Sequence, residues 1–220
     1  MPYLVRPLSE DALNAMVPRV RTELERQFTE VLSLDESPEG RNLLALEVAI
    51  TYVQRVIQHD VETIRSGNAI TLLKMEEELK APMPFNGSEV LLKGMADRID
   101  RLGDGTVRII DYKTGARSIK KAITDPEDLA KSGYEHFFQL LMYGLMYANG
   151  NDASTIRPAL FYVRNSDMEK PLVVFEDEAQ LSGMQLVNYA KERLEELFSE
   201  LFNPDLPFYQ TEDTKRCANC

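Results

Sequence analysis

The chain has 220 residues, of which 44% are apolar, and this size and composition are sufficient for a sizeable buried core. Its formal net charge of −11 excludes a protein that attracts nucleic acid through its overall field, so nucleic-acid binding would need a local basic patch, metal ions or partner domains. No apolar run has the length of a membrane span, and the first residues lack the features of a signal peptide. We therefore expect a cytoplasmic protein with no membrane contact.

Two amphipathic helices are predicted in a helical N-terminal part, residues 1–66. Apolar residues recur at three- and four-residue steps over residues 9–33, and again over residues 41–65, where Gly67 and Asn68 end the pattern. We expect the apolar stripe of the second helix to pack in the core; its members are Leu43, Leu46, Ile50, Val53, Ile57, Val61 and Ile64.

Three strands are predicted next, as an antiparallel meander. The first runs over residues 69–81 into an acidic segment and is expected to end at Pro82 and Pro84. A turn at Asn86 and Gly87 precedes the second strand, and a Gly-Asp-Gly turn joins it to the third. The second and third strands are predicted at 89–101 and 106–113.

The second half of the chain predicts a change of architecture. It contains in order a loop, a helix, two strands and a long helix, at 115–133, 134–148, 156–164, 171–176 and 178–202. A strand–helix–strand pattern after a meander favours an α/β fold with one mixed central sheet of about five strands flanked by helices. We expect a single domain over 1–220, with its sheet-and-helix core at 69–202 and an irregular tail at 203–220.

The most informative charged residues lie on the second predicted strand and at the end of the third. Side chains alternate along a strand, so Asp111 and Lys113 share one face with the apolar Val107 and Ile109. Ionised groups beside a core are costly unless they are paired. A divalent cation held by Asp97 and Asp111, with Lys113 beside it, would satisfy them.

This chemistry suits phosphodiester hydrolysis. Magnesium prefers oxygen ligands, and a bound ion polarises the phosphoryl oxygen and lowers the pKa of a bound water. Lys113 would orient or help to deprotonate that water and neutralise the transition state. The alternative is a surface salt bridge among Asp97, Asp111 and Lys113, because charged residues at strand ends are common.

Three motifs in this order resemble the PD-(D/E)xK nuclease superfamily, in particular its RecB/AddB-type nuclease domains. They are G-M-A-D ending at Asp97, I-D-Y-K-T-G containing Asp111 and Lys113, and Q-L-L-M-Y from Gln139 to Tyr143. The resemblance implies a restriction-endonuclease-like fold and a DNA nuclease that depends on Mg²⁺ or Mn²⁺. It also implies work in DNA end processing, recombination and double-strand-break repair, with a helicase domain or subunit as partner.

The same resemblance assigns roles to five residues. It makes Asp97 and Asp111 the metal ligands and Lys113 the catalytic lysine. Gln139 and Tyr143 lie four residues apart on one helical face, and by resemblance they position DNA or brace the site. The alternative for this last pair is a helix that packs its tyrosine inward with the glutamine as its partner.

Further candidates come from the resemblance, each with a structural alternative. Glu76 precedes the first motif at a place where many relatives carry an acid, but Glu77 and Glu78 compete with it, and all three also fit a solvated acidic run. Relatives of the RecB type carry an upstream His or Glu ligand. We expect His59 instead on a helix surface and His136 in a partly buried structural role.

Two further groups of residues are candidates for binding an iron–sulfur cluster and DNA phosphates. Cys217 and Cys220 form a C-x-x-C that resembles part of the [4Fe–4S] site of AddB-type relatives; two thiolates are too few for a closed cluster, so we interpret them as an incomplete segment or as two idle cysteines. The loop residues Arg117, Lys120 and Lys121 either contact DNA phosphates or belong to a solvated loop.

Three functions therefore remain in competition. The first is a magnesium-dependent DNA nuclease domain. The second is a catalytically inactive scaffold or DNA-end-binding module of a helicase complex, which the strong acidity of the chain favours. The third is a stand-alone exonuclease of a CRISPR-associated or phage type, which would share the chemistry of the first and differ in partners.

Overall fold

A five-stranded mixed sheet forms the centre of the computed structural model, which describes residues 5–33, 38–115, 122–131 and 133–208. The strands lie in chain order across the sheet. They are β1 (Ile70–Phe85), β2 (Ser88–Leu102), β3 (Val107–Lys113), β4 (Ile156–Tyr162) and β5 (Glu169–Pro171). A separate two-stranded ribbon consists of β6 (Phe175–Glu176) and β7 (Ala179–Gln180).

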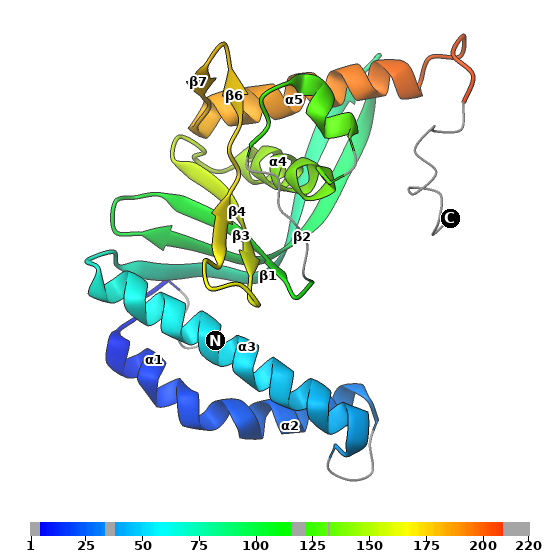
Figure 1. Cartoon of the computed structure of the whole chain (residues 1–220). Coiled ribbons are helices and arrows are strands. Elements are labelled where there is room, and N and C mark those ends of the chain that lie inside the picture. Colours follow the sequence, from blue (N-terminus) through cyan, green and yellow to red (C-terminus); the bar gives the residue numbers. More distant parts are fainter. Residues whose placement is uncertain (1–4, 34–37, 116–121, 132, 209–220) are drawn as a thin grey trace.

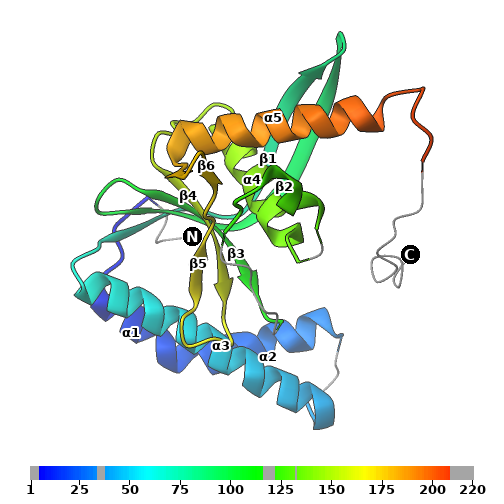
Figure 2. The ribbon, with the colours of Figure 1, turned by 45° about the horizontal axis from the view of Figure 1, so that its top comes forward.

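Helices cover both faces of this sheet, as Figures 1 and 2 show. On one face lie α1 (Glu10–Met16), the short 3-10 helix η1 (Val17–Arg19), α2 (Val20–Val31) and α3 (Gly40–Arg65). On the other lie α4 (Glu135–Ala148) and α5 (Gly183–Leu201), with the 3-10 helix η2 (Pro126–Ala130) before α4. The predicted α/β class, with a mixed sheet, flanking helices and an N-terminal helical segment, is confirmed.

The connections of the sheet determine where its charged residues meet. The pairs β1–β2 and β2–β3 are antiparallel, whereas β3 and β4 are parallel, and α4 crosses over between them. Parallel strands end at the same edge, so the end of β3 at Lys113 lies beside the end of β4 at Tyr162. This edge of the sheet carries the candidate site.

The prediction that Pro82 and Pro84 end the first strand is wrong. The strand β1 continues through both prolines to Phe85, with Pro82 opposite Leu91 and Pro84 opposite Glu89 on β2. The strand β1 is the first in the sheet order, so only one of its sides is paired along this stretch. An edge strand tolerates proline because the missing N–H can fall on the unpaired side.

Three other boundaries also differ from expectation. The first predicted helix is divided by η1, because Pro18 lacks the N–H that a continuous helix would need at that position. The predicted strand at 171–176 is divided between β5 and β6. The last helix begins at Gly183, not near residue 178, because Asp177 and Glu178 adopt positive φ angles of 46° and 66° in the turn between β6 and β7.

The predicted stripe of α3 is only partly buried. Leu46, Ile50, Ile57 and Val61 pack in the core, but Leu43 and Val53 remain 44% and 37% exposed. The helix α3 packs against two neighbours, α1–α2 on one side and the sheet on the other. Its contact with the sheet uses Tyr52 and Val56 in addition, which lie outside the predicted stripe.

Side-chain alternation along β3 separates two cores. Val107 and Ile109 pack with α4 and α5, as expected from their shared face. Ile110 points to the opposite face, where it packs with Phe161 of β4 beneath α3. None of the helices in the described ranges is both long enough and apolar enough to cross a membrane.

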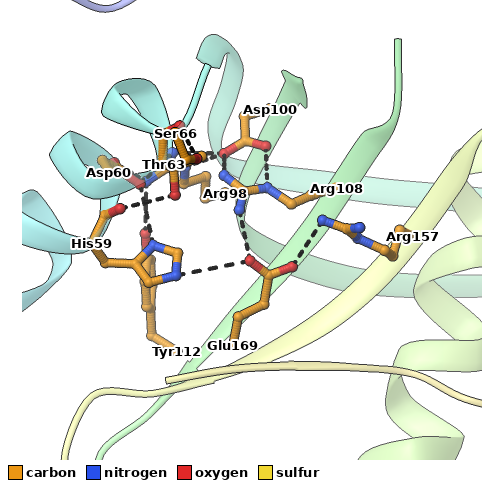
Figure 3. A network of polar contacts seen from close by, with 10 residues as sticks. All are labelled: His59, Asp60, Thr63, Ser66, Arg98, Asp100, Arg108, Tyr112, Arg157 and Glu169. Atoms are coloured by element: carbon orange, nitrogen blue, oxygen red, sulfur yellow. Dashed lines mark hydrogen bonds and ion pairs between the residues drawn. The ribbon is translucent and has the colours of Figure 1, made fainter. Parts of the chain in front are cut away.

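A buried network of charged side chains joins α3 to the sheet on this second face (Figure 3). Arg98 of β2 donates to both oxygens of Asp60 on α3, over 2.7 and 3.2 Å, and its Nε donates to Asp100 over 2.7 Å. Arg98 and Asp60 are each 3% exposed, and Asp100 is fully buried.

The network continues across the sheet and balances its charges. Arg108 of β3 donates to both oxygens of Asp100 and, through Nη1, to Glu169 over 2.8 Å. Glu169 also accepts from Arg157 over 3.1 Å. Three arginines thus meet three carboxylates, which is the condition under which buried ions are tolerated.

Replacing Asp60 should therefore destabilise the fold. Although burial by itself raises the pKa of the Asp60 carboxyl, attraction to Arg98 lowers it below its usual value, so the group is a buried anion. The Asp60→Ala variant leaves a buried guanidinium without its bidentate partner, and we expect a loss of about 3–5 kcal/mol of unfolding free energy in urea denaturation.

The matched control for this prediction is Glu62→Ala, which removes an exposed carboxylate from the same helix. We expect it to change the unfolding free energy by about 0.5 kcal/mol or less. Equal effects of the two substitutions would show that the ion network contributes no more than a surface pair.

Candidate active site

The strands β2 and β3 lose their mutual pairing at the point where the acidic candidates stand. The last paired residues at this edge are Arg98 and Ile110, and Asp97 and Asp111 are the next residues on each strand. In place of a ladder bond, the backbone N–H of Tyr112 donates to Oδ2 of Asp97 over 2.7 Å. A side-chain contact therefore holds the two strands together beside the carboxylates.

Gln139 on α4 connects the charged residues of β3. Its Nε2 donates to Oδ1 of Asp111 over 3.0 Å, and its Oε1 accepts from Nζ of Lys113 over 3.1 Å. The same Nε2 donates to the hydroxyl of Tyr143 over 2.7 Å. The amide orientation follows from this arrangement, because the reverse orientation would direct the NH₂ group at an ammonium. Gln139 thus bridges the anion and the cation of the site.

A glycine allows α4 to approach β2 closely enough for these contacts. A Cβ at Gly94 would lie 2.7 Å from Cε of Met146 and 2.9 Å from Cε1 of Tyr143. Both distances are shorter than van der Waals contact. The first residue of the G-M-A-D motif therefore makes room for the tyrosine ring of the Q-L-L-M-Y motif.

Burial and neighbouring charges alter the acidity of the site. Burial raises the pKa of Asp97; the N–H of Tyr112 opposes this rise, the carboxylate of Asp111 adds to it, and Lys113 opposes it. Burial also raises the pKa of Tyr143, with the two carboxylates adding to the effect. The tyrosine is thus a neutral phenol at physiological pH, and the proton on Asp97 is lost at a higher pH than from an ordinary Asp.

The donor set fits a divalent cation. Asp111 is 5% exposed, and its Oδ2 receives no hydrogen bond from the described residues, although it lies 2.5 Å from Nζ of Lys113 in an ion pair. A buried carboxylate oxygen that faces one ammonium still has a lone pair for a further positive partner. Together with Asp97, it offers the oxygen ligands that Mg²⁺ and Mn²⁺ accept.

Five of the seven residues that the sequence singles out for the site are brought together by the structure: Asp97, Asp111, Lys113, Gln139 and Tyr143. Their catalytic and metal-binding roles stay predictions. The other two, Cys217 and Cys220, lie outside the described residues, and so do Arg117, Lys120 and Lys121 of the basic loop.

The acidic segment of β1 contributes less clearly. Glu76 stands between the pairs Met75–Arg98 and Glu77–Ala96, which places it opposite Asp97 in register, but its φ angle is +49° and its side chain is exposed. Glu77 and Glu78 each form an ion pair with a lysine of the same strand. In the described part of the chain, no group of three or more His, Cys, Asp or Glu residues has the geometry to hold a metal ion.

The two histidines lie in different surroundings. His59 is not on the helix surface as expected, because its side chain is 22% exposed and packs edge-on against Phe161. Its Nδ1 lies 3.8 Å from Oδ1 of Asp60, and its Nε2 lies 3.9 Å from Oε2 of Glu169. It belongs to the charged network of Figure 3 on the far face of the sheet. His136 on α4 is partly buried, as expected.

The residues that support the site from behind were not predicted from the sequence. Arg98 directly follows Asp97, and Tyr112 stands between Asp111 and Lys113, yet both point to the face of α3. The signal for Arg98 was the run D-R-I-D at 97–100, in which alternation places Arg98 and Asp100 on the face opposite to Asp97. The partner on α3, Asp60, carried no signal in the sequence.

Comparisons with known proteins identify a family for this chain. Residues 6–220 match the family described as the PD-(D/E)XK nuclease superfamily. Relatives named as a subunit of an ATP-dependent helicase/deoxyribonuclease, from Streptococcus pyogenes serotype M49 (strain NZ131) and serotype M4 (strain MGAS10750), are each 29% identical over 70 residues. These residues are 32% of this chain and 6% of each relative, so the chain spans a small part of the length of those proteins.

A solved structure described as "Crystal structure of SSO0001" aligns with 89% of this chain and 86% of its own at 16% identity. Its TM-score of 0.29 is too low for a comparison of folds. The family match, in contrast, extends over nearly the whole chain and includes all three motifs of the site. The chain belongs to the PD-(D/E)XK nuclease superfamily.

Proposed function

We propose that this chain is a magnesium-dependent DNA nuclease domain that hydrolyses phosphodiester bonds. The observation that carries the proposal is the connected cluster of Asp111, Lys113, Gln139 and Tyr143, with Asp97 beside it on β2. The cluster combines two carboxylates for a cation with a lysine for a phosphate, and Asp97 and Lys113 are partly exposed, whereas Asp111 is buried.

Each residue of the site would have its own role in the hydrolysis. Asp97 and Asp111 would hold the divalent cation, which supplies Lewis-acid polarisation of a phosphate oxygen and a bound water of lowered pKa. Lys113 would place its ammonium beside the reacting phosphate and stabilise the charge that develops there. Gln139 holds Lys113 and Asp111 in a fixed relation, and Tyr143 in turn holds the amide of Gln139.

The relatives suggest a setting for this reaction. Because the matched proteins are named as subunits of a helicase/deoxyribonuclease, we propose a helicase domain or subunit as partner and DNA ends as substrate, in recombination and double-strand-break repair in the cytoplasm. An iron–sulfur cluster that includes Cys217 and Cys220 stays a proposal based on the sequence alone.

A second candidate is a nuclease fold without catalysis, which binds DNA ends or docks a partner. The ion pair between Lys113 and Asp111 favours it, because the two groups neutralise each other without a cation. Metal titration separates the two candidates, since a catalytic site has to bind Mg²⁺ or Mn²⁺ through the same carboxylates.

Cleavage should depend on Lys113. The Lys113→Ala variant removes the ammonium beside the phosphate while the carboxylates remain, so we expect metal-dependent cleavage of single-stranded DNA to fall by about 100-fold or more in a chain that still folds. The control Lys191→Ala removes an exposed lysine of α5 and should cleave as the wild type does. Unchanged cleavage by Lys113→Ala would reject the assignment.

Metal binding should depend on Asp111. The Asp111→Asn substitution keeps the side-chain shape but removes the anionic oxygen, so we expect the Mn²⁺ dissociation constant in isothermal titration calorimetry to rise by about tenfold or more. Asp104→Asn, in the turn at the other end of the same hairpin, is the control. If Asp111→Asn binds Mn²⁺ as tightly as Asp104→Asn does, Asp111 is not a metal ligand. That result would favour the nuclease fold without catalysis.

Acid should weaken metal binding at a higher pH than an ordinary aspartate would cause. A protonated carboxyl cannot serve as an anionic ligand, and burial raises the pKa of Asp97, so protons compete with the cation above the usual pKa of about 3.9. We expect Mn²⁺ affinity to decline as the pH falls through this raised pKa. An affinity that stays constant until about pH 4 would contradict it.

A further inference from the structure

The two residues that follow the acids on β2 and β3 meet on the opposite face of the sheet. Asp97 and Asp111 face α4, whereas their neighbours Arg98 and Tyr112 face α3 (Figure 3). There, Nη1 of Arg98 donates to the hydroxyl of Tyr112 over 3.3 Å. On both strands, the acid therefore points to one face, and the residue after it forms a contact between the strands on the other face.

These contacts stand where the backbone ladder between β2 and β3 has ended. Beyond Arg98 and Ile110, no register pair joins the two strands in the described residues. Two contacts bridge them instead, and both involve Tyr112: its N–H donates to Asp97 on the face of α4, and its hydroxyl accepts from Arg98 on the face of α3. The separation of the strands at the acids thus depends on one residue.

Arg98 is itself held firmly enough to serve as an anchor. Its guanidinium is bound on two sides, by Asp60 of α3 and by Asp100 of its own strand, and it is 3% exposed. The ring of Tyr112 packs edge-on against Phe161 of β4, with centroids 5.8 Å apart. The hydroxyl of Tyr112 therefore meets a donor whose position is determined by the charged network and by α3.

We infer that Tyr112 and Arg98 are positioning residues that determine the separation of the two metal-binding carboxylates. This inference rests on the proposed function, because it assumes that Asp97 and Asp111 hold the cation. A cation needs both carboxylates at a defined distance, and partners behind the ligands commonly determine that distance. Through Asp60, the N-terminal helix α3 takes part in shaping a site that it does not line.

The test is the Tyr112→Phe variant of the full chain, with Mn²⁺ alone as the probe. The substitution removes one oxygen and keeps the ring against Phe161, while Arg98 keeps both of its carboxylate partners. We expect the Mn²⁺ dissociation constant in calorimetry to rise about tenfold, at the lower end of the usual range because the lost contact is long, with little change in melting temperature.

The matched control is Tyr52→Phe. Tyr52 packs in the same apolar cluster beneath α3, and its hydroxyl has no contact with the acids or with Arg98 in the described part of the chain. We expect it to bind Mn²⁺ as the wild type does. A weakening that appears in Tyr112→Phe alone supports the inference, because loss of cluster packing would affect both variants.

The outcomes are distinct. If the wild type binds Mn²⁺ and Tyr112→Phe binds it within twofold of the wild type, the positioning role is wrong and the proposed function stands. If both tyrosine variants weaken binding equally, or binding falls only together with the melting temperature, the role is also wrong. A wild-type protein that binds no Mn²⁺ would overturn the metal site and this inference together.

Discussion

Pairing of buried charge on the two faces of β2 and β3 is the constraint on which this structure depends. Alternation along each strand sends acids to one face and their neighbours to the other, so both faces of the sheet contain ionised groups near a core. Each face satisfies them differently. The face of α3 uses a network of arginines and carboxylates, whereas on the face of α4 Oδ2 of Asp111 has an ion pair with Lys113.

The network on the face of α3 therefore supports the structure, whereas the carboxylates on the face of α4 are the candidates for binding a cation. A network whose arginines and carboxylates balance in charge gains little from a further ion, and it holds its members in one arrangement. A carboxylate that faces a lysine, an amide and a tyrosine hydroxyl can exchange a partner for a cation. The N-terminal helices therefore have a structural part in the site: α3 supplies Asp60, the residue that binds Arg98 directly behind Asp97.

Two errors of sequence interpretation share one physical origin. Pro82 and Pro84 end a strand only where both of its sides are paired, and the sequence does not tell which strand lies at the edge of the sheet. His59 fits a helix surface by its spacing, but α3 is covered on two sides, so the residue is mostly buried against Phe161. In each case the position of a neighbouring element decided the outcome.

The sequence by itself determined the class of the fold, the order of its main elements and the three motifs, because apolar periodicity and turn residues act over short stretches of chain. It also placed Asp111 and Lys113 on one face, since alternation is a local property of a strand. Only the tertiary structure decided that Gln139 bridges them, that Gly94 makes room for Tyr143, and that Arg98 meets Asp60. Those contacts join residues distant in the chain, and their geometry exists only once the helices have packed on the sheet.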